Sequence, residues 1–113
     1  MTRLTHATRL RVFIGDDDTY GNQPLCDVIL ATAREARLAG VTVFRGVAGF
    51  GRSAYVHEVF RGFSHDLPIV LEIVDTAERI EAWLPILREL LRGGFVTMEP
   101  IQIVTWPQTA QAA

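Results

Sequence analysis

Apolar residues recur at every second position in some stretches of the chain and at helical spacing in others. Residues 9–15 alternate: Leu10, Val12 and Ile14 point one way, while Arg11 and Phe13 point the other. That period of two predicts a strand. Residues 41–48 and 67–74, rich in β-branched side chains, predict two further strands, and residues 95–99 and 101–106 predict two short strand pieces separated by a proline.

Two stretches between these strands carry apolar stripes of helical period. Residues 16–22 are turn-forming, and we expect Asn22 to cap the first helix, Pro24 to lie in its first turn and Gly40 to end it. The apolar stripe of this helix consists of Leu25, Val28, Ile29, Ala33 and Ala36.

The second helix follows the third strand. Asp75 and Glu78 have the spacing of a capping box, and we expect Pro85 to kink or briefly break the helix. Arg92 beside two glycines is typical of a helix C-terminus. The apolar stripe consists of Ile80, Trp83, Leu84, Leu87, Leu90 and Leu91.

The element order is therefore βαββαβ, with an extra short C-terminal strand. Right-handed crossovers place both helices on one face of a four-stranded antiparallel sheet, which is the α+β ferredoxin-like fold. We expect one domain over residues 9–106, a flexible N-terminus over 1–8 and a disordered tail over 107–113. Residues 49–63 form the long connection, which favours a functional loop.

The sheet face without helices carries Phe13, Val70 and Val74, an apolar surface that favours an oligomer built through the sheets. Arg11 and Glu72 share that face by parity on strands that should be neighbours. We expect them to form an ion pair, within one chain or between two.

Composition narrows the functional classes. The chain has 113 residues, a net charge of -2 and 11 basic residues, all of them arginine. Nucleic-acid binding is disfavoured because there is no basic excess, and Schiff-base lysine chemistry is excluded. Cys26, the single cysteine, excludes an internal disulfide, and its apolar setting favours packing over reactivity. Neither a signal peptide nor a membrane-inserted helix is expected, so we expect a cytoplasmic protein.

Residues 40–74 read GVTVFRGVAGFGRSAYVHEVFRGFSHDLPIVLEIV, and this stretch resembles the nitrogen-regulatory PII signalling proteins. Residues 9–106 resemble more closely a bacterial and archaeal family of unknown function classed as PII-like. The segments that carry this resemblance are IGDDD, AGVTVFRGVAGFG and DLPIVLEIVDTAERIEAWLPIL.

The resemblance implies a ferredoxin-like homotrimer with its sheets inside, and clefts between subunits that bind a small effector such as an adenine nucleotide. Gly49, Phe50, Gly51 and Arg52 match the Gly-Phe-Gly-Arg of PII proteins at the base of the long loop. PII proteins carry a second phosphate-binding loop at the position of residues 91–95, and here Arg92 is the only basic residue of that stretch. A ligand with one phosphate or a cyclic phosphate therefore fits more easily than a triphosphate. Tyr55 does not match the tyrosine that some PII proteins modify, and we expect no such modification.

The best candidate site combines glycines with arginines. Glycines let backbone N–H groups approach a phosphate, and a guanidinium group can bind it through two parallel hydrogen bonds. Its residues are Arg45, Gly46, Gly49, Phe50, Gly51, Arg52 and Arg92. Asp16, Asp17 and Asp18 are candidate Mg²⁺ ligands, although acidic turns before helices are common.

Three functions remain open. The first is a regulatory protein that binds an effector and acts on a transporter, channel or enzyme through residues 49–63. The second is a metal-binding or metal-tolerance trimer that uses His57 or His65, near Glu58 and Asp66. The third is a structural oligomer without a ligand. No nucleophile–base pair is evident, so an enzyme is not expected, and no cofactor is firmly indicated.

Overall fold

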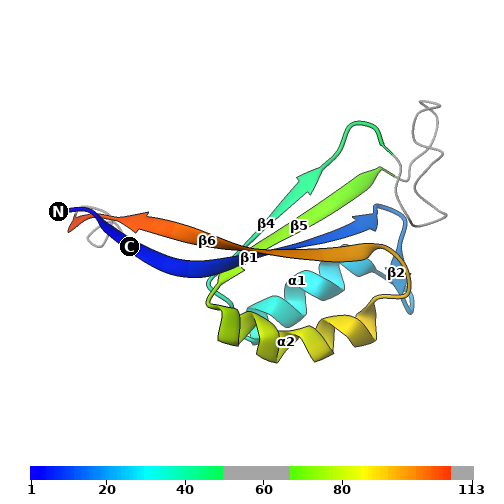
Figure 1. Cartoon of the computed structure of the whole chain (residues 1–113). Coiled ribbons are helices and arrows are strands. Elements are labelled where there is room, and N and C mark those ends of the chain that lie inside the picture. Colours follow the sequence, from blue (N-terminus) through cyan, green and yellow to red (C-terminus); the bar gives the residue numbers. More distant parts are fainter. Residues whose placement is uncertain (50–66, 108–113) are drawn as a thin grey trace.

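The computed structural model describes residues 1–49 and 67–107. The elements of the described chain, in order, are β1 (Arg3–Gly15), β2 (Thr19–Tyr20), β3 (Gln23–Pro24), α1 (Leu25–Glu35), β4 (Gly40–Arg45), β5 (Pro68–Asp75), α2 (Ala77–Leu90) and β6 (Phe95–Thr105). Strands β4, β5, β1 and β6 lie in that order in one antiparallel sheet, and α1 and α2 both cover one of its faces (Figure 1). The α+β ferredoxin-like prediction is confirmed.

The core lies between the sheet and the two helices. β1 and β5 contribute the side chains predicted by their alternation, and α1 and α2 contribute their apolar stripes. Trp83 of α2 is fully buried there. Among the described helices, none is both long and apolar enough to span a bilayer.

Strands β1 and β6 are both longer than predicted. β1 begins at Arg3, and its first residues pair with the end of β6 from Arg3 opposite Thr105 onward, so the expectation of a flexible segment over 1–8 is wrong for residues 3–8. β6 is one strand that passes through Pro100, which lies opposite Thr8, so the two predicted pieces and the extra short strand are wrong. Pro100 is tolerated because β6 is an edge strand.

The ends of α1 differ from the sequence expectation. Pro24, and not Asn22, is the N-cap residue, because residues 19–24 form the small β2–β3 hairpin. At the other end, Arg37 adopts a left-handed φ of 58°, and the N–H of Leu38 bonds to the carbonyl of Ala33. That is a Schellman motif with arginine where glycine is usual, so Gly40 is free to begin β4.

The start of α2 also differs. Thr76 is its N-cap and accepts a hydrogen bond from the N–H of Arg79, so the predicted capping box of Asp75 and Glu78 is wrong. The helix continues through Pro85 without a break and ends at Leu90, two residues before Arg92.

The open face of the sheet carries an aromatic stack and ion pairs. Phe13 and Phe95 stack with centroids 4.6 Å apart. The predicted pair of Arg11 and Glu72 is present within one chain at 2.9 Å, and Arg9 bonds to Glu99 at 2.6 Å.

We expect Glu72→Gln to lower the free energy of unfolding by about 1 kcal/mol, because the partly buried Arg11 would lose its ion pair of 2.9 Å and keep only the longer one, of 4.0 Å, with Glu99. The melting temperature should fall by about 4 °C, whereas Glu89→Gln, at an exposed position of α2, should leave it unchanged. Unaltered melting and assembly in the Glu72 variant would show that the pair stabilises nothing.

Candidate functional site

The candidate ligand-binding residues that the structure describes lie at one end of the sheet. Arg45 is the last residue of β4 and pairs with Ile69 at the start of β5, next to the pair of Gly15 and Pro68. β6 begins at the same end, with Phe95 opposite Phe13, and Arg92 shortly precedes it. The end of β4 and the start of β6 thus reach one end of the sheet from segments far apart in sequence, while the start of β1 and the end of β6 lie at the other end (Figure 1).

Arg45 is held by an ion pair. One of its guanidinium nitrogens lies 2.5 Å from a carboxylate oxygen of Asp16, and both side chains are partly exposed. The N–H of Asp16 donates to the carbonyl of Leu67 at 2.8 Å, which fixes the acidic turn beside the start of β5. An anion that binds Arg45 therefore has to compete with Asp16 or share the guanidinium with it.

Gly46 lies against Pro68. Its N–H donates to the carbonyl of Pro68 at 2.7 Å, and a Cβ at this position would lie 2.7 Å from the ring carbon Cγ of that proline. A side chain would push the chain away from β5 just after Arg45. Glycine is thus required for packing here, which accounts for Gly46 without any ligand.

The three aspartates Asp16, Asp17 and Asp18 lie in the turn after β1. One carboxylate oxygen of Asp18 accepts the N–H of Gly15 at 3.0 Å, and the carbonyl of Asp18 accepts the N–H of Leu25 at the start of α1. With Asp16 engaged by Arg45, these bonds explain two of the three aspartates structurally. In the described part of the chain, no group of three or more His, Cys, Asp or Glu residues is placed to hold a metal.

Several predicted positions fall outside the described residues. Phe50, Gly51 and Arg52 are among them, as are Tyr55 and the proposed metal ligands His57, Glu58, His65 and Asp66. Gly49 is the last described residue before this segment.

Cys26 lies near the candidate site on α1. Its side chain is half buried and packs against the core. Burial, followed by the negative charge of Asp27, raises the pKa of the thiol above its usual value. The thiol is therefore mostly protonated at neutral pH, which agrees with the predicted packing role.

Sequence reasoning missed a groove between α2 and β6. It has a volume of about 490 Å³ and is lined by Glu81, Leu84, Pro85, Leu87, Arg88, Leu91 and Val96. Leu84 and Leu91 were assigned to the buried stripe, yet both are only half buried, because β6 is an edge strand that α2 does not fully cover. The signal for this groove in the sequence was the apolar stripe of α2, which is wider than one helix face needs to cover a core.

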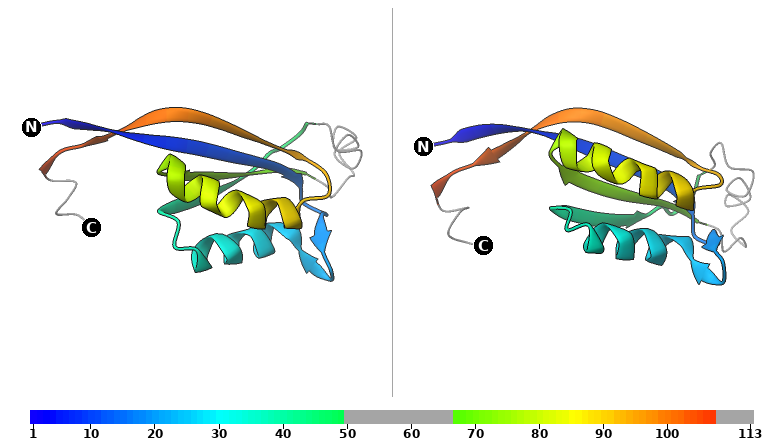
Figure 2. Two further views of the ribbon diagram at one scale, coloured as in Figure 1. Left: turned by 60° about the horizontal axis from the view of Figure 1, so that its bottom comes forward. Right: turned by 90° about the horizontal axis from the view of Figure 1, so that it is seen from below.

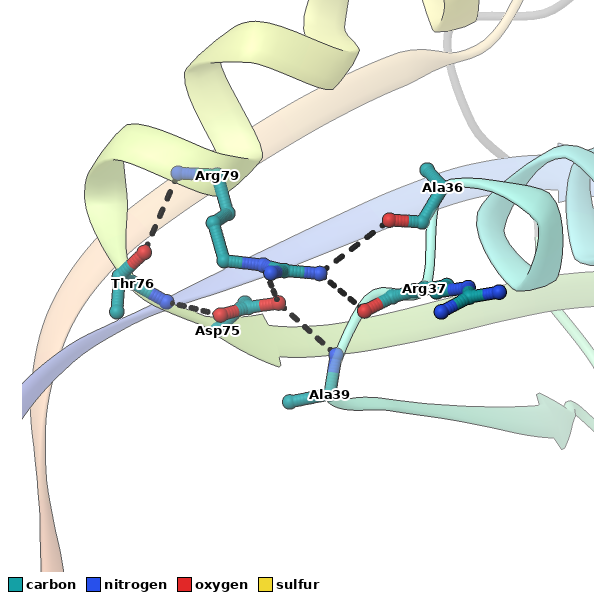
Figure 3. Close-up of polar contacts among 6 residues, drawn as sticks. All are labelled: Ala36, Arg37, Ala39, Asp75, Thr76 and Arg79. Carbon is teal, nitrogen blue, oxygen red and sulfur yellow. Dashed lines mark hydrogen bonds and ion pairs between the residues drawn. The ribbon is translucent and has the colours of Figure 1, made fainter.

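The carboxylate with the clearest structural role lies far from this end. Asp75 is buried at the end of β5, and it accepts hydrogen bonds from the N–H groups of Thr76 (2.7 Å) and Ala39 (2.9 Å) and from the guanidinium of Arg79 (3.0 Å) (Figure 3). Arg79 also donates to the carbonyls of Ala36 and Arg37 at the end of α1.

Burial opposes ionisation of Asp75, but these hydrogen bonds and the charge of Arg79 outweigh it and hold the pKa of the carboxyl below its usual value. The cluster joins the end of α1, the start of β4 and the start of α2. It is a structural clamp, and Asp75 is not a candidate for acid–base chemistry.

Solved structures with the same fold include PII-like proteins. CPII from Thiomonas intermedia K12, in a structure described as bound to ADP, AMP and acetate, has a TM-score of 0.60 and 18% sequence identity, covering 95% of this chain and 96% of that one. A putative PII-like signaling protein from Thermus thermophilus, TTHA0516, has a TM-score of 0.56 and 14% identity, covering 90% of this chain and 91% of that one. At such identities the likeness concerns the fold alone.

Sequence relatives are closer. A UPF0166 protein from Aquifex aeolicus is 32% identical over 107 residues, which is 90% of this chain and 97% of the relative. UPF0166 protein MJ1524 from Methanocaldococcus jannaschii is 29% identical over 92 residues, covering 80% of this chain and 84% of the relative. The model of the DUF190 family, described as "Uncharacterized ACR, COG1993", matches residues 7–103. The chain therefore belongs to the DUF190 family, and it has the PII-like form of the ferredoxin-like fold.

Proposed function

We propose that this protein is a PII-like regulatory protein that binds an adenine nucleotide or a similar anion, and that it is not an enzyme. The observation that supports the proposal is that Arg45 at the end of β4 and Arg92 shortly before β6 belong to the same end of the sheet, although β4 and β6 are its opposite edges. The fold adds support, because CPII has the same fold and one of its structures is described as bound to ADP and bicarbonate.

The ligand would lie between copies of the chain, in a homotrimer whose open sheet faces meet. One chain supplies few positive charges at this end, and Asp16 already neutralises part of the charge of Arg45. A cleft shared by two copies would add basic groups from the second chain. The same charge balance favours a ligand with one phosphate, or a cyclic phosphate, over a triphosphate.

Ligand binding would be communicated to a protein partner through residues 49–63. The N–H of Gly46, the residue after Arg45, is hydrogen-bonded to the carbonyl of Pro68. A shift of Arg45 on ligand binding would therefore be passed on to the residues just before this segment. A transporter, channel or enzyme is the class of partner we propose. Residues 50–63 lie outside the described part of the chain, and the proposal is that the bound ligand changes how this segment meets the partner.

Calorimetric titration tests the proposal. We expect one or more of AMP, ADP, ATP and a cyclic adenine nucleotide to bind the wild-type protein, and Arg45→Ala or Arg52→Ala to weaken binding about tenfold or more, because each removes a charge-assisted contact. Arg34→Ala, at an exposed position near the C-terminal end of α1, is the matched control and should bind as the wild type does.

The outcomes are distinct. If no nucleotide binds, or if the Arg45, Arg52 and Arg34 variants lose affinity equally, the site is wrong. Binding of Cu²⁺ or Zn²⁺ alone, lost in a His57→Ala, His65→Ala variant, would favour the metal-binding alternative. Binding of neither class would favour a structural oligomer.

A further inference from the structure

The groove between α2 and β6 opens along a free edge of the sheet. β6 pairs with β1 on one side and, among residues 1–49 and 67–107, with nothing on the other. Past the groove it continues into a two-stranded arm, which consists of residues 3–7 of β1 and residues 101–105 of β6 and reaches beyond both helices (Figure 2). Where a groove lies beside an exposed edge strand, an extended peptide can add a strand to the sheet and place alternate side chains in the groove.

The backbone of β6 is available along this edge. Pro100 lies within the β6 ladder opposite Thr8, and proline is tolerated inside an edge strand where its nitrogen faces away from the neighbouring strand. Outward-facing backbone groups alternate along an antiparallel pair. Val96 and Met98, which share the parity of Pro100, therefore direct their N–H and C=O groups toward the free edge. An added strand would find hydrogen-bond donors and acceptors beside the groove.

Apolar side chains line the groove on both sides. Leu84 and Leu91 of α2 and Val96 of β6 are only half buried in this chain. Met98 faces the same side of β6 as Val96, and it is 42% exposed. The groove volume of about 490 Å³ lies within the range of about 300–1,000 Å³ that is typical of ligand sites. An occupant would remove this apolar surface from water, which favours association.

Charged groups at the groove indicate the chemistry of its occupant. Glu81 and Arg88 both line it, and neither forms an ion pair with another described residue. Pro85 has no N–H, so the carbonyl of Glu81 also lacks the donor that a helix supplies four residues further on. The Glu81 end therefore favours a positive charge with hydrogen-bond donors, and the Arg88 end favours a carboxylate.

We propose that the groove binds an extended segment of a partner protein, which adds a strand to β6. Glu81 and Arg88 lie about 10 Å apart along the helix axis, and an extended chain covers that distance in about three to four residues. Residues at alternate positions of a strand point to the same side. The segment therefore carries a basic, an apolar and an acidic residue at alternate positions.

This role goes beyond the proposed nucleotide binding, because none of the residues that line the groove belongs to the candidate ligand-binding residues. It also differs from an assembly through the open sheet faces. The groove lies on the side of the sheet that the helices cover, so contact between open faces leaves it uncovered.

Fluorescence anisotropy with the labelled peptide Thr-Lys-Thr-Leu-Thr-Glu-Thr tests the proposal. We expect saturable binding to the wild type, and binding at least tenfold weaker when serine replaces the leucine of the peptide or in the protein variant Leu84→Ser. Ile86→Ser is the matched control, because Ile86 is 46% exposed on α2 but does not line the groove, and it should bind as the wild type does. The absence of saturable binding up to millimolar peptide would overturn the proposal, as would equal losses in the Leu84 and Ile86 variants.

A charge reversal tests the chemistry of the occupant without touching the apolar walls. Arg88→Glu gives the groove an acidic residue at both ends, so this variant should prefer the peptide Thr-Lys-Thr-Leu-Thr-Lys-Thr over the original one. The wild type should show the opposite preference. The same preference in both proteins would mean that these charges do not select the occupant, which rejects the proposal.

Strand addition has a signature of its own. N-methylation of every second peptide residue should be tolerated and N-methylation of the residues between them should abolish binding, because only alternate N–H groups of an added strand face β6. An equal effect at all positions would exclude an added strand. If no peptide binds and Leu84→Ser instead changes the oligomeric state, a second copy of the chain covers the groove and the proposal is wrong.

Discussion

Gly94→Ala is expected to lower the free energy of unfolding by about 3 kcal/mol or more. Gly94 has a left-handed φ of 73°, and a Cβ built on it would lie 2.2 Å from the carbonyl oxygen of Phe13. That oxygen belongs to the central strand β1, so it cannot move aside without disturbing the sheet. The start of β6 would have to shift instead, at the point where Phe95 stacks on Phe13.

Gly21→Ala is the matched control for this substitution. Gly21 has a similar φ of 63° in the β2–β3 turn, but a Cβ there would meet no atom within 4 Å. Gly21→Ala should lower the free energy of unfolding by only about 1 kcal/mol, which is the cost of a side chain on a left-handed backbone. Chemical denaturation of both variants separates the contact from the backbone strain. Equal losses in the two variants would show that Gly94 is not packed against β1 as described.

Asp75→Asn is expected to lower the free energy of unfolding by about 2–3 kcal/mol, and Asp75→Ala by about 3–5 kcal/mol. The two carboxylate oxygens of Asp75 accept N–H groups of Thr76 and Ala39, and Arg79 donates to the same oxygen as Ala39. An amide has only one acceptor oxygen, so one of these donors would face an NH₂ group. Removal of the carboxylate would also leave the guanidinium group of Arg79, which reaches from α2 to the end of α1, without its counter-charge (Figure 3).

Glu78→Ala controls for the loss of a negative charge at the start of α2. Glu78 is exposed in the first turn of the helix, and its loss should change the free energy of unfolding by less than about 0.5 kcal/mol. A larger loss in Glu78→Ala than in Asp75→Asn would restore the capping-box interpretation that the structure contradicts.

The stability contributed by Asp75 depends on pH in a defined direction. Its pKa is lowered in the folded protein, so the unfolded chain binds the proton more readily. The contribution is therefore fully present above the unfolded pKa of about 4 and is lost as pH falls through the lower folded value. Acid titration of the free energy of unfolding should be flatter in Asp75→Asn than in the wild type, and identical slopes would contradict the lowered pKa.

The sequence predicted the fold well because its strands and helices carry strong periods. The alternation from Leu10 to Ile14 correctly placed Arg11 opposite Glu72, since parity and neighbouring strands determine which side chains can meet. Predictions of element ends were weaker. Arg37 takes the left-handed position that glycine usually occupies, and its carbonyl accepts a hydrogen bond from Arg79. Thr76 takes the cap that the spacing assigned to Asp75, whose carboxylate instead accepts hydrogen bonds from Ala39 and Arg79.

For the candidate site, too, the sequence suggested residues but not their partners. The sequence suggested Arg45 and Gly46 as candidate ligand-binding residues, but only the structure shows that Arg45 pairs with Asp16, because Asp16 follows β1 and is far from Arg45 in sequence. The arm was missed for a related reason. Residues 3–8 are mixed in character, and they become a strand only because they pair with the second half of β6 beyond Pro100.

NMR amide mapping with an adenine nucleotide locates the proposed ligand site on the fold. We expect shifts confined to the end of the sheet around residues 15–18, 45–49 and 92–94, with the arm and the Asp75 clamp unchanged. Shifts centred on the arm or on the groove between α2 and β6 would contradict the proposed site. The absence of any shift with every adenine nucleotide at saturating concentration would contradict the proposed function itself.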